Sequence, residues 1–187
     1  MTEFETAARL TEFAKEANDN AVQHGWWDGE RDNRELIALI HDELSEALEE
    51  YRCGRDLVWY DEKKPGKPED IAVELIDMVI RIADFMGHFG LKFGFCDKIA
   101  WLSCESDSAP VLIAKLHSIL GGLMQEGDID WATGEIQSED HVADALTEMC
   151  CIAFDWLYPR GIDPWELLKE KHEYNKSRSY RHGNKLC

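Results

Sequence analysis

The stretch Ile71-Ala-Val-Glu-Leu-Ile-Asp-Met-Val-Ile-Arg-Ile-Ala-Asp-Phe-Met86 is apolar nearly all round, and the carboxylates of Glu74 and Asp77 interrupt it. A helix that is apolar on every side lies in the core of a protein, so we predict a buried helix here. Charged groups in a core need partners, because their burial without one is costly. Glu74 and Asp77 are therefore candidate functional residues.

A second acidic pair, Glu43-Leu-Ser-Glu46, borders the apolar stripe of the preceding helical stretch. In both pairs the carboxylates are three residues apart, which puts them on one face of a helix. Two such helices packed side by side would direct four carboxylates at one small volume. Like charges at that distance raise each other's pKa unless a multivalent cation lies among them. The predicted metal ligands are Glu43, Glu46, Glu74 and Asp77.

Each motif also has a structural interpretation. Arg81 follows Asp77 by four residues, so the two can form an ion pair within one helix. Helices rich in glutamate are common on protein surfaces, so Glu43 and Glu46 can belong to a solvated face. The combination of the two acidic motifs favours the metal site over these interpretations.

The composition indicates one globular domain over residues 1–187. The 187 residues are 44% hydrophobic, enough for a well-buried core. No apolar run approaches the ~20 residues needed to cross a bilayer, and the first residues do not resemble a signal peptide. We therefore predict a cytoplasmic protein with no membrane partner. The six cysteines include no C-x-x-C pair, which favours reduced core thiols over disulfides or a zinc site.

The formal net charge of −18 argues against binding to duplex nucleic acid. Basic residues gather near the end of the chain, where Lys171, Asn175 and Arg178 are spaced i, i+4 and i+7, on one helical face. Two cations and an amide on one face can hold a polyphosphate chain. The alternative is a basic last turn that interacts with its own helix dipole.

The pattern of helix signals predicts an all-α bundle of about six helices. A capping box at Thr2 opens the first, and Asp163-Pro164 opens the last. Alternation typical of strands is scarce, and no motif assigns residues 90–107. The expected helices begin near residues 2, 31, 69, 108, 138 and 163, and we expect a loop over 61–68 because it holds two prolines and a glycine.

The fourth helix resembles the second. Residues 36–50, aligned without gaps to residues 112–126, share six identities in fifteen pairs. Either a degenerate duplication or common helix composition explains this likeness. In a duplication, Ile119 and Gly122 would replace Glu43 and Glu46, so the second copy would keep the scaffold and lose the ligands.

Two adjacent tryptophans, Trp26 and Trp27, follow the first helix in a segment that glycines punctuate. They cannot share one face of a regular element. We expect one to pack inward and the other to offer a flat surface on which a ligand base can stack.

These motifs together resemble the MazG-like and dimeric-dUTPase superfamily of all-α nucleoside triphosphate pyrophosphohydrolases. The resemblance rests on the two acidic motifs 27 residues apart, on His24-Gly-Trp-Trp-Asp28, on Lys67-Pro68, and on Lys171-x-x-Tyr-Asn-x-x-Arg178 with His182-Gly183. It covers the first three helices and the last segment, whereas residues 90–159 match no motif of the family.

The resemblance implies hydrolysis of a nucleoside triphosphate between the α and β phosphates, in clearance of unwanted nucleotides. It implies that the four carboxylates bind Mg²⁺, with Mn²⁺ as a substitute, and that Lys171, Asn175 and Arg178 hold phosphates. Many relatives have a glutamate where this chain has Asp42, so Asp42 is an alternative ligand only. We expect Glu46, or else Glu43, to be the general base, and the chain to form a homodimer or higher homo-oligomer.

Three other functions remain as alternatives. A dUTPase-type hydrolase of dUTP or dUDP belongs to the same superfamily and differs in base preference. An acidic helical interaction protein without catalysis would explain the charge of −18, although not the carboxylates in the apolar helix. A carboxylate-bridged di-iron bundle normally requires Glu-x-x-His pairs, and no histidine of this chain follows a glutamate by three residues.

Overall fold

The computed structural model describes residues 3–54, 57–60, 67–94 and 104–181, and these form an all-α bundle, as predicted. No helix in these ranges is long and apolar enough to cross a membrane. The helices are α1 (Glu3–Gln23), α2 (Asn33–Cys53), α3 (Ile71–Phe89), α4 (Ala109–Gln125), α5 (Glu139–Leu157) and α6 (Pro164–Lys176), with a short 3₁₀ helix, η2 (Tyr158–Arg160), after α5. Thr2 and its capping box lie outside the described residues.

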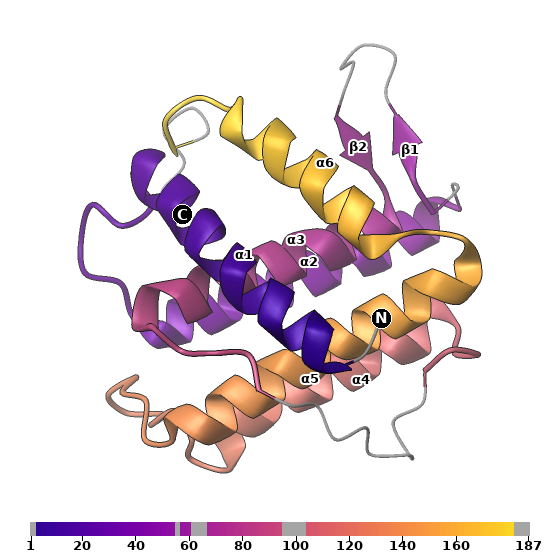
Figure 1. Ribbon diagram of the computed structural model, residues 1–187. Helices are drawn as coiled ribbons and strands as arrows, with labels where there is room; N and C mark the ends of the chain where they lie inside the picture. The colour runs from indigo at the N-terminus through magenta and orange to yellow at the C-terminus, as the bar shows by residue number, and fades with distance from the viewer. Residues whose placement is uncertain (1–2, 55–56, 61–66, 95–103, 182–187) are drawn as a thin grey trace.

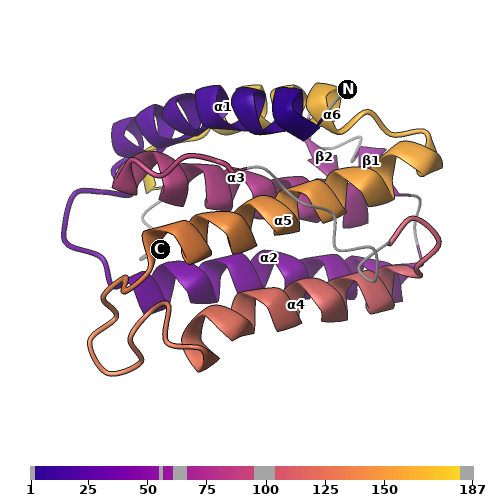
Figure 2. The same ribbon diagram turned by 60° about the horizontal axis from the view of Figure 1, so that its bottom comes forward.

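Helix α3 lies at the centre of the bundle and packs against α1, α2, α5 and α6. Figure 2 shows three layers, with α1 and α6 above α3 and α5, and with α2 and α4 below them. Twelve of the nineteen residues of α3 are buried, including Glu74. The prediction of a buried helix is therefore confirmed, with Glu74 buried and Asp77 and Asp84 half-buried.

The start of α3 differs from the prediction. The helix begins at Ile71 rather than near Glu69, because Pro68–Glu69 forms the strand β2, which pairs antiparallel with β1 (Trp59–Tyr60). The side chain of Asp70 then caps the helix by accepting from the backbone N–H of Ile71, and Asp70 holds a left-handed φ of 103°. Sequence analysis missed this small hairpin (Figure 1), and residues 61–66 of the expected loop lie outside the described residues.

The helices α2 and α4, which the internal alignment relates, lie side by side. The alignment matches His41 with His117, and the structure brings these two imidazoles together with Nδ1 atoms 2.8 Å apart and nearly parallel rings. A hydrogen bond between two imidazole nitrogens needs at least one neutral ring. Partial burial lowers the pKa of both histidines.

The close packing of α1 on α3 depends on Gly87. A Cβ atom added there would lie 2.3 Å from the carbonyl oxygen of Ala14 and 2.9 Å from Cβ of Asn18. Only a residue without a side chain allows this approach, since Cβ atoms do not come so near to backbone oxygens. Gly87 thereby also determines how near Asn18 lies to α3.

We expect Gly87→Ala to lower the free energy of unfolding by about 1–3 kcal/mol, because α1 must move away from α3 to admit the methyl group. Urea denaturation monitored by circular dichroism measures this change. Gly121→Ala is the matched control, since a Cβ at this position of α4 meets nothing within 4 Å and alanine favours a helix. Equal stability of the two variants would contradict the packing argument.

The His41–His117 contact predicts a dependence of stability on pH. A histidine whose pKa is lower in the folded state stabilises the fold above its unfolded pKa of about 6.5 and loses that contribution as the pH falls. We expect the free energy of unfolding to fall more between pH 7.5 and pH 5 in the unmodified protein than in the His117→Asn variant. An identical change with pH in both proteins, measured by urea denaturation, would exclude this contribution.

Candidate functional site

One pocket contains every site residue that the sequence predicted. Its walls come from α1, α2, α3, α6, the segment between α1 and α2, and the residues that follow α6. The predicted residues in its lining are Trp26, Trp27, Glu43, Glu46, Glu74, Asp77, Lys171, Asn175 and Arg178. Asp42, the alternative ligand, is exposed and does not line the pocket.

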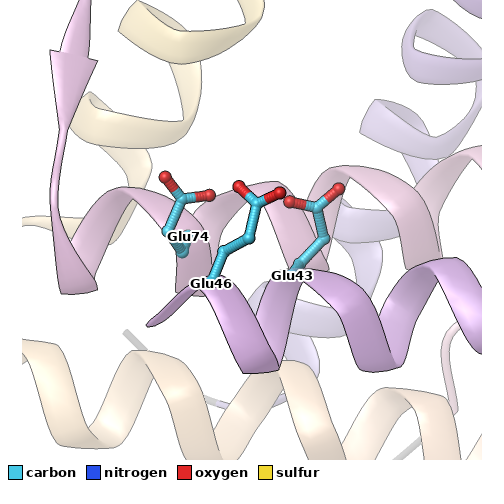
Figure 3. A group of neighbouring side chains, drawn as sticks. All are labelled: Glu43, Glu46 and Glu74. Carbon is cyan, nitrogen blue, oxygen red and sulfur yellow. The ribbon is translucent and has the colours of Figure 1, made fainter. Parts of the chain in front are cut away.

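Three of the four predicted metal ligands form a compact acidic cluster. Glu43, Glu46 and Glu74 each offer one carboxylate oxygen, and these oxygens lie within 4.8 Å of one another. Figure 3 shows Glu43 and Glu46 rising from α2 beside Glu74 of α3, with all three carboxylates on the same side. Glu43 and Glu74 are buried, whereas Glu46 is exposed. Carboxylates converging from two helices suit a hard divalent cation.

Asp77, the fourth predicted ligand, pairs with a cation of another helix. Its Oδ2 lies 2.7 Å from Nζ of Lys171, which is only 4% exposed. Arg81, the partner of Asp77 in the structural interpretation, instead donates from Nε to Oε1 of Glu43 at 2.8 Å. The alternative interpretation, an ion pair between Asp77 and Arg81 within α3, is therefore not the arrangement observed, because a carboxylate on α2 and a lysine on α6 offer partners across the helices.

The two buried glutamates hold their protons more tightly than usual. Burial raises the pKa of Glu43 to about 7, with Arg81 opposing the shift and the carboxylates of Asp77 and Glu46 adding to it. Burial and the Asp77 carboxylate raise the pKa of Glu74 to about 8, and Lys171 opposes this shift. The nearby cations thus do not fully offset the acidic charge. A divalent cation among the three carboxylates would do so, and the donor set fits one.

The predicted phosphate-binding residues line the same pocket as the acidic cluster. Lys171 and Asn175 belong to α6, whereas Arg178 follows the end of that helix and does not complete its face. The buried Oδ1 of Asn175 has no hydrogen-bond partner within the described residues. Burial lowers the pKa of the Arg178 guanidinium. These three groups border the acidic cluster, as contact with a polyphosphate requires.

The segment between α1 and α2 makes hydrogen bonds to the residues that follow α6. The His24 ring contacts the carbonyl oxygens of Asn20 and Arg178 through Nδ1 and Nε2, at 2.8 and 3.0 Å. Arg181 donates its backbone N–H to His24 and its Nε to the carbonyl of Gly25. Gly25 has a φ of 79°, and a Cβ there would meet the ring of Tyr180. These contacts explain how Arg178 reaches a pocket formed largely by distant helices.

Both tryptophans are half-buried and line the pocket. Trp27 stacks on His88 with ring centroids 3.5 Å apart and donates from Nε1 to Oδ1 of Asp84 at 2.9 Å. The Trp26 ring has the guanidinium of Arg81 5.6 Å from its centroid. Both border the pocket, and Trp27 also packs against the hydrophobic core, as expected for one of the pair. Stacking of a ligand base on the other tryptophan stays a prediction.

Sequence analysis missed Asp84, which also lines the pocket. It follows Asp77 by seven residues, so it lies on the same face of α3. A third carboxylate on one face of an otherwise apolar helix is the signal that could have identified it. Arg31 and Lys67 also belong to the charged lining. Lys67 lies in the Lys67-Pro68 motif of the resemblance, whereas the sequence around Arg31 contained no comparable signal.

We expect the raised pKa of Glu74 to destabilise the metal-free protein at high pH. An acid that binds its proton more tightly in the folded state costs stability as the pH rises from about 4.5 to about 8. The Glu74→Gln variant should therefore exceed the unmodified protein in free energy of unfolding at pH 8.5, by on the order of 2 kcal/mol, and match it near pH 4.5. Urea denaturation without metal tests this.

Added Mg²⁺ should reverse that order at pH 8.5. A cation that binds only the folded protein raises its stability, and the variant lacks one ligand. A variant less stable than the unmodified protein at pH 8.5 without metal would contradict the electrostatic argument.

Comparison of the chain with protein-family models, with curated proteins and with solved structures gave no match. The resemblance to MazG-like pyrophosphohydrolases therefore stays a prediction from the motifs. The geometry of the pocket is the remaining basis for a functional conclusion.

Proposed function

We propose that the protein is a Mg²⁺-dependent nucleoside triphosphate pyrophosphohydrolase that cleaves its substrate to a nucleoside monophosphate and pyrophosphate. One observation carries this proposal. The acidic cluster of Glu43, Glu46 and Glu74 opens into the same pocket as Lys171 and Arg178. A triphosphate needs both a divalent cation and positively charged side chains, since its negative charge must be offset before water can attack phosphorus.

The three clustered carboxylates would hold the metal, for which Mn²⁺ can substitute. When bound, Mg²⁺ offsets phosphate charge and lowers the pKa of a coordinated water. Asp77 holds Lys171 at 2.7 Å, so that it positions the ammonium group beside the acidic cluster. Glu43 is similarly held by Arg81. Lys171 of α6 and Arg81 of α3 thus orient the carboxylates of Asp77 and Glu43, respectively.

Glu46 is the best candidate for the general base. It is the exposed member of the cluster, so a water molecule can reach it, whereas Glu43 is buried and hydrogen-bonded to Arg81. Glu46 would accept the proton of the water that attacks the α-phosphorus. The proton leaves the nucleophile as the bond to the β-phosphate breaks.

Lys171, Asn175 and Arg178 would hold the phosphates and the departing pyrophosphate. Lys171 acts as a point charge, and the planar guanidinium of Arg178 can bind two oxygens at once. The Asn175 amide can donate to a phosphate oxygen through its nitrogen. The contact of His24 with the backbone of Arg178 makes His24 a positioning residue for this end of the pocket.

Clearance of unwanted deoxynucleotides, a homo-oligomeric state and a cytoplasmic location remain part of this proposal. The acidic cluster supports it over a purely acidic interaction protein, because two of its carboxylates are buried in a pocket rather than spread over a surface. An interaction protein would have no reason to bury them.

Pyrophosphate release from a panel of deoxynucleoside triphosphates tests the proposal. We expect release only with Mg²⁺ or Mn²⁺, and a loss of at least about 100-fold in the Glu43→Gln variant, because the metal loses a ligand. Glu49→Gln is the matched control, since Glu49 is an exposed glutamate of the same helix and does not line the pocket. No release from any triphosphate by the folded protein would refute the proposal.

A further inference from the structure

Asp84 has one carboxylate oxygen engaged by the protein. Its Oδ1 accepts from Nδ2 of Asn18 at 2.8 Å and from Nε1 of Trp27 at 2.9 Å. A carboxylate oxygen accepts about two hydrogen bonds, so these donors saturate Oδ1. Asp84 lines the pocket, and Oδ2 is the oxygen left to accept from a ligand there.

The orientation of this carboxylate is fixed by packing on both sides. Trp27 stacks on His88 of the same helix as Asp84, so its Nε1 cannot turn away without losing that contact. Asn18 belongs to α1, which Gly87 allows to lie against α3. A polar group held in this way discriminates between ligands, because a wrong partner cannot be accommodated by a rotation.

The carboxylate is an acceptor at neutral pH. Burial raises the pKa of Asp84 to about 6, and the donors Asn18 and Trp27 and the guanidinium groups of Arg81 and Arg31 oppose that shift. Above pH 7 the group is mainly ionised, and an ionised carboxylate accepts hydrogen bonds but does not donate them.

Asp84 lies at a suitable distance from the phosphate-binding end of the pocket. It follows Asp77 by seven residues on the same face of α3, which corresponds to about 10 Å along the helix axis. Asp77 contacts Lys171, and Asp84 contacts Trp27. A nucleotide with its phosphates near Lys171 would therefore place its base beside Asp84 and the tryptophans, where it can meet Oδ2.

We propose that Asp84 selects nucleobases with an exocyclic amino group, cytosine or adenine, over uracil and thymine. This inference rests on the proposed function. The amino groups of cytosine and adenine donate hydrogen bonds, whereas a carbonyl oxygen takes that position in uracil and thymine. A carbonyl oxygen facing Oδ2 would bring two hydrogen-bond acceptors together with no proton to share, which disfavours binding. The dUTPase alternative would require the opposite preference.

Binding of non-hydrolysable nucleotides separates base preference from catalysis. The probes are the α,β-imido analogues of dCTP and dUTP with Mg²⁺, measured by isothermal titration calorimetry. Their bases have the same ring size and differ in the group at C4. We expect the unmodified protein to bind the dCTP analogue at least about tenfold more tightly, because only cytosine can donate a hydrogen bond to the charged carboxylate.

The Asp84→Asn variant should lose or invert this preference. Its amide oxygen can still accept from Asn18 and Trp27, while its nitrogen presents a donor to the base in place of Oδ2. The Asp19→Asn variant is the matched control, because Asp19 is an exposed aspartate of α1 that does not line the pocket. It removes the same charge and should keep the preference. Thermal unfolding checks that both variants are folded.

Equal affinities for the two analogues in the unmodified protein would overturn the inference, as would an unchanged preference in Asp84→Asn or failure of both analogues to bind. The proposed function fails separately. Preference for the dCTP analogue without pyrophosphate release from any triphosphate would refute hydrolysis and keep the role of Asp84. If Asp84→Asn and the unmodified protein release pyrophosphate from dCTP and from dUTP in the same ratio, only the role of Asp84 is refuted.

Discussion

The burial of acidic side chains in α3 is the constraint on which the rest of the site depends. Glu74 and Asp77 lie in the central helix of the bundle, where water cannot solvate them fully. Lys171 of α6 offsets the charge of Asp77, and Arg81 of α3 offsets that of Glu43 on the neighbouring helix α2. These pairs do not fully compensate the acidic charge, since the pKa values of Glu43 and Glu74 remain raised. The remaining charge favours a bound cation.

Because α3 lies at the centre of the bundle, one of its faces contributes several acidic side chains to the pocket. Successive acidic residues on that face meet different neighbours. Glu74 meets α2, Asp77 meets α6, and Asp84 meets α1 and the tryptophan segment. Close packing at Gly87 and the contacts of His24 keep these neighbours in place. This arrangement brings acidic, cationic and aromatic side chains into one pocket.

The pairing of α2 with α4 gives the internal alignment a structural counterpart. The aligned residues His41 and His117 contact each other between the two helices. Ile119 and Gly122 take the aligned positions of Glu43 and Glu46, and neither lines the pocket. The second helix of the pair therefore supports α2 without contributing ligands, because apolar and small residues pack but cannot coordinate a cation.

The sequence alone determined the helices and the chemistry they carry. Apolar periodicity and caps are local, so they predicted the six helices and the burial of α3, and all nine proposed site residues line one pocket. The tertiary structure decided the partners. Spacing within a helix suggested Arg81 for Asp77, whereas the fold joins Asp77 to Lys171. Sequence spacing describes only neighbours on one helix, and a buried charge pairs with whichever opposite charge packing brings nearest.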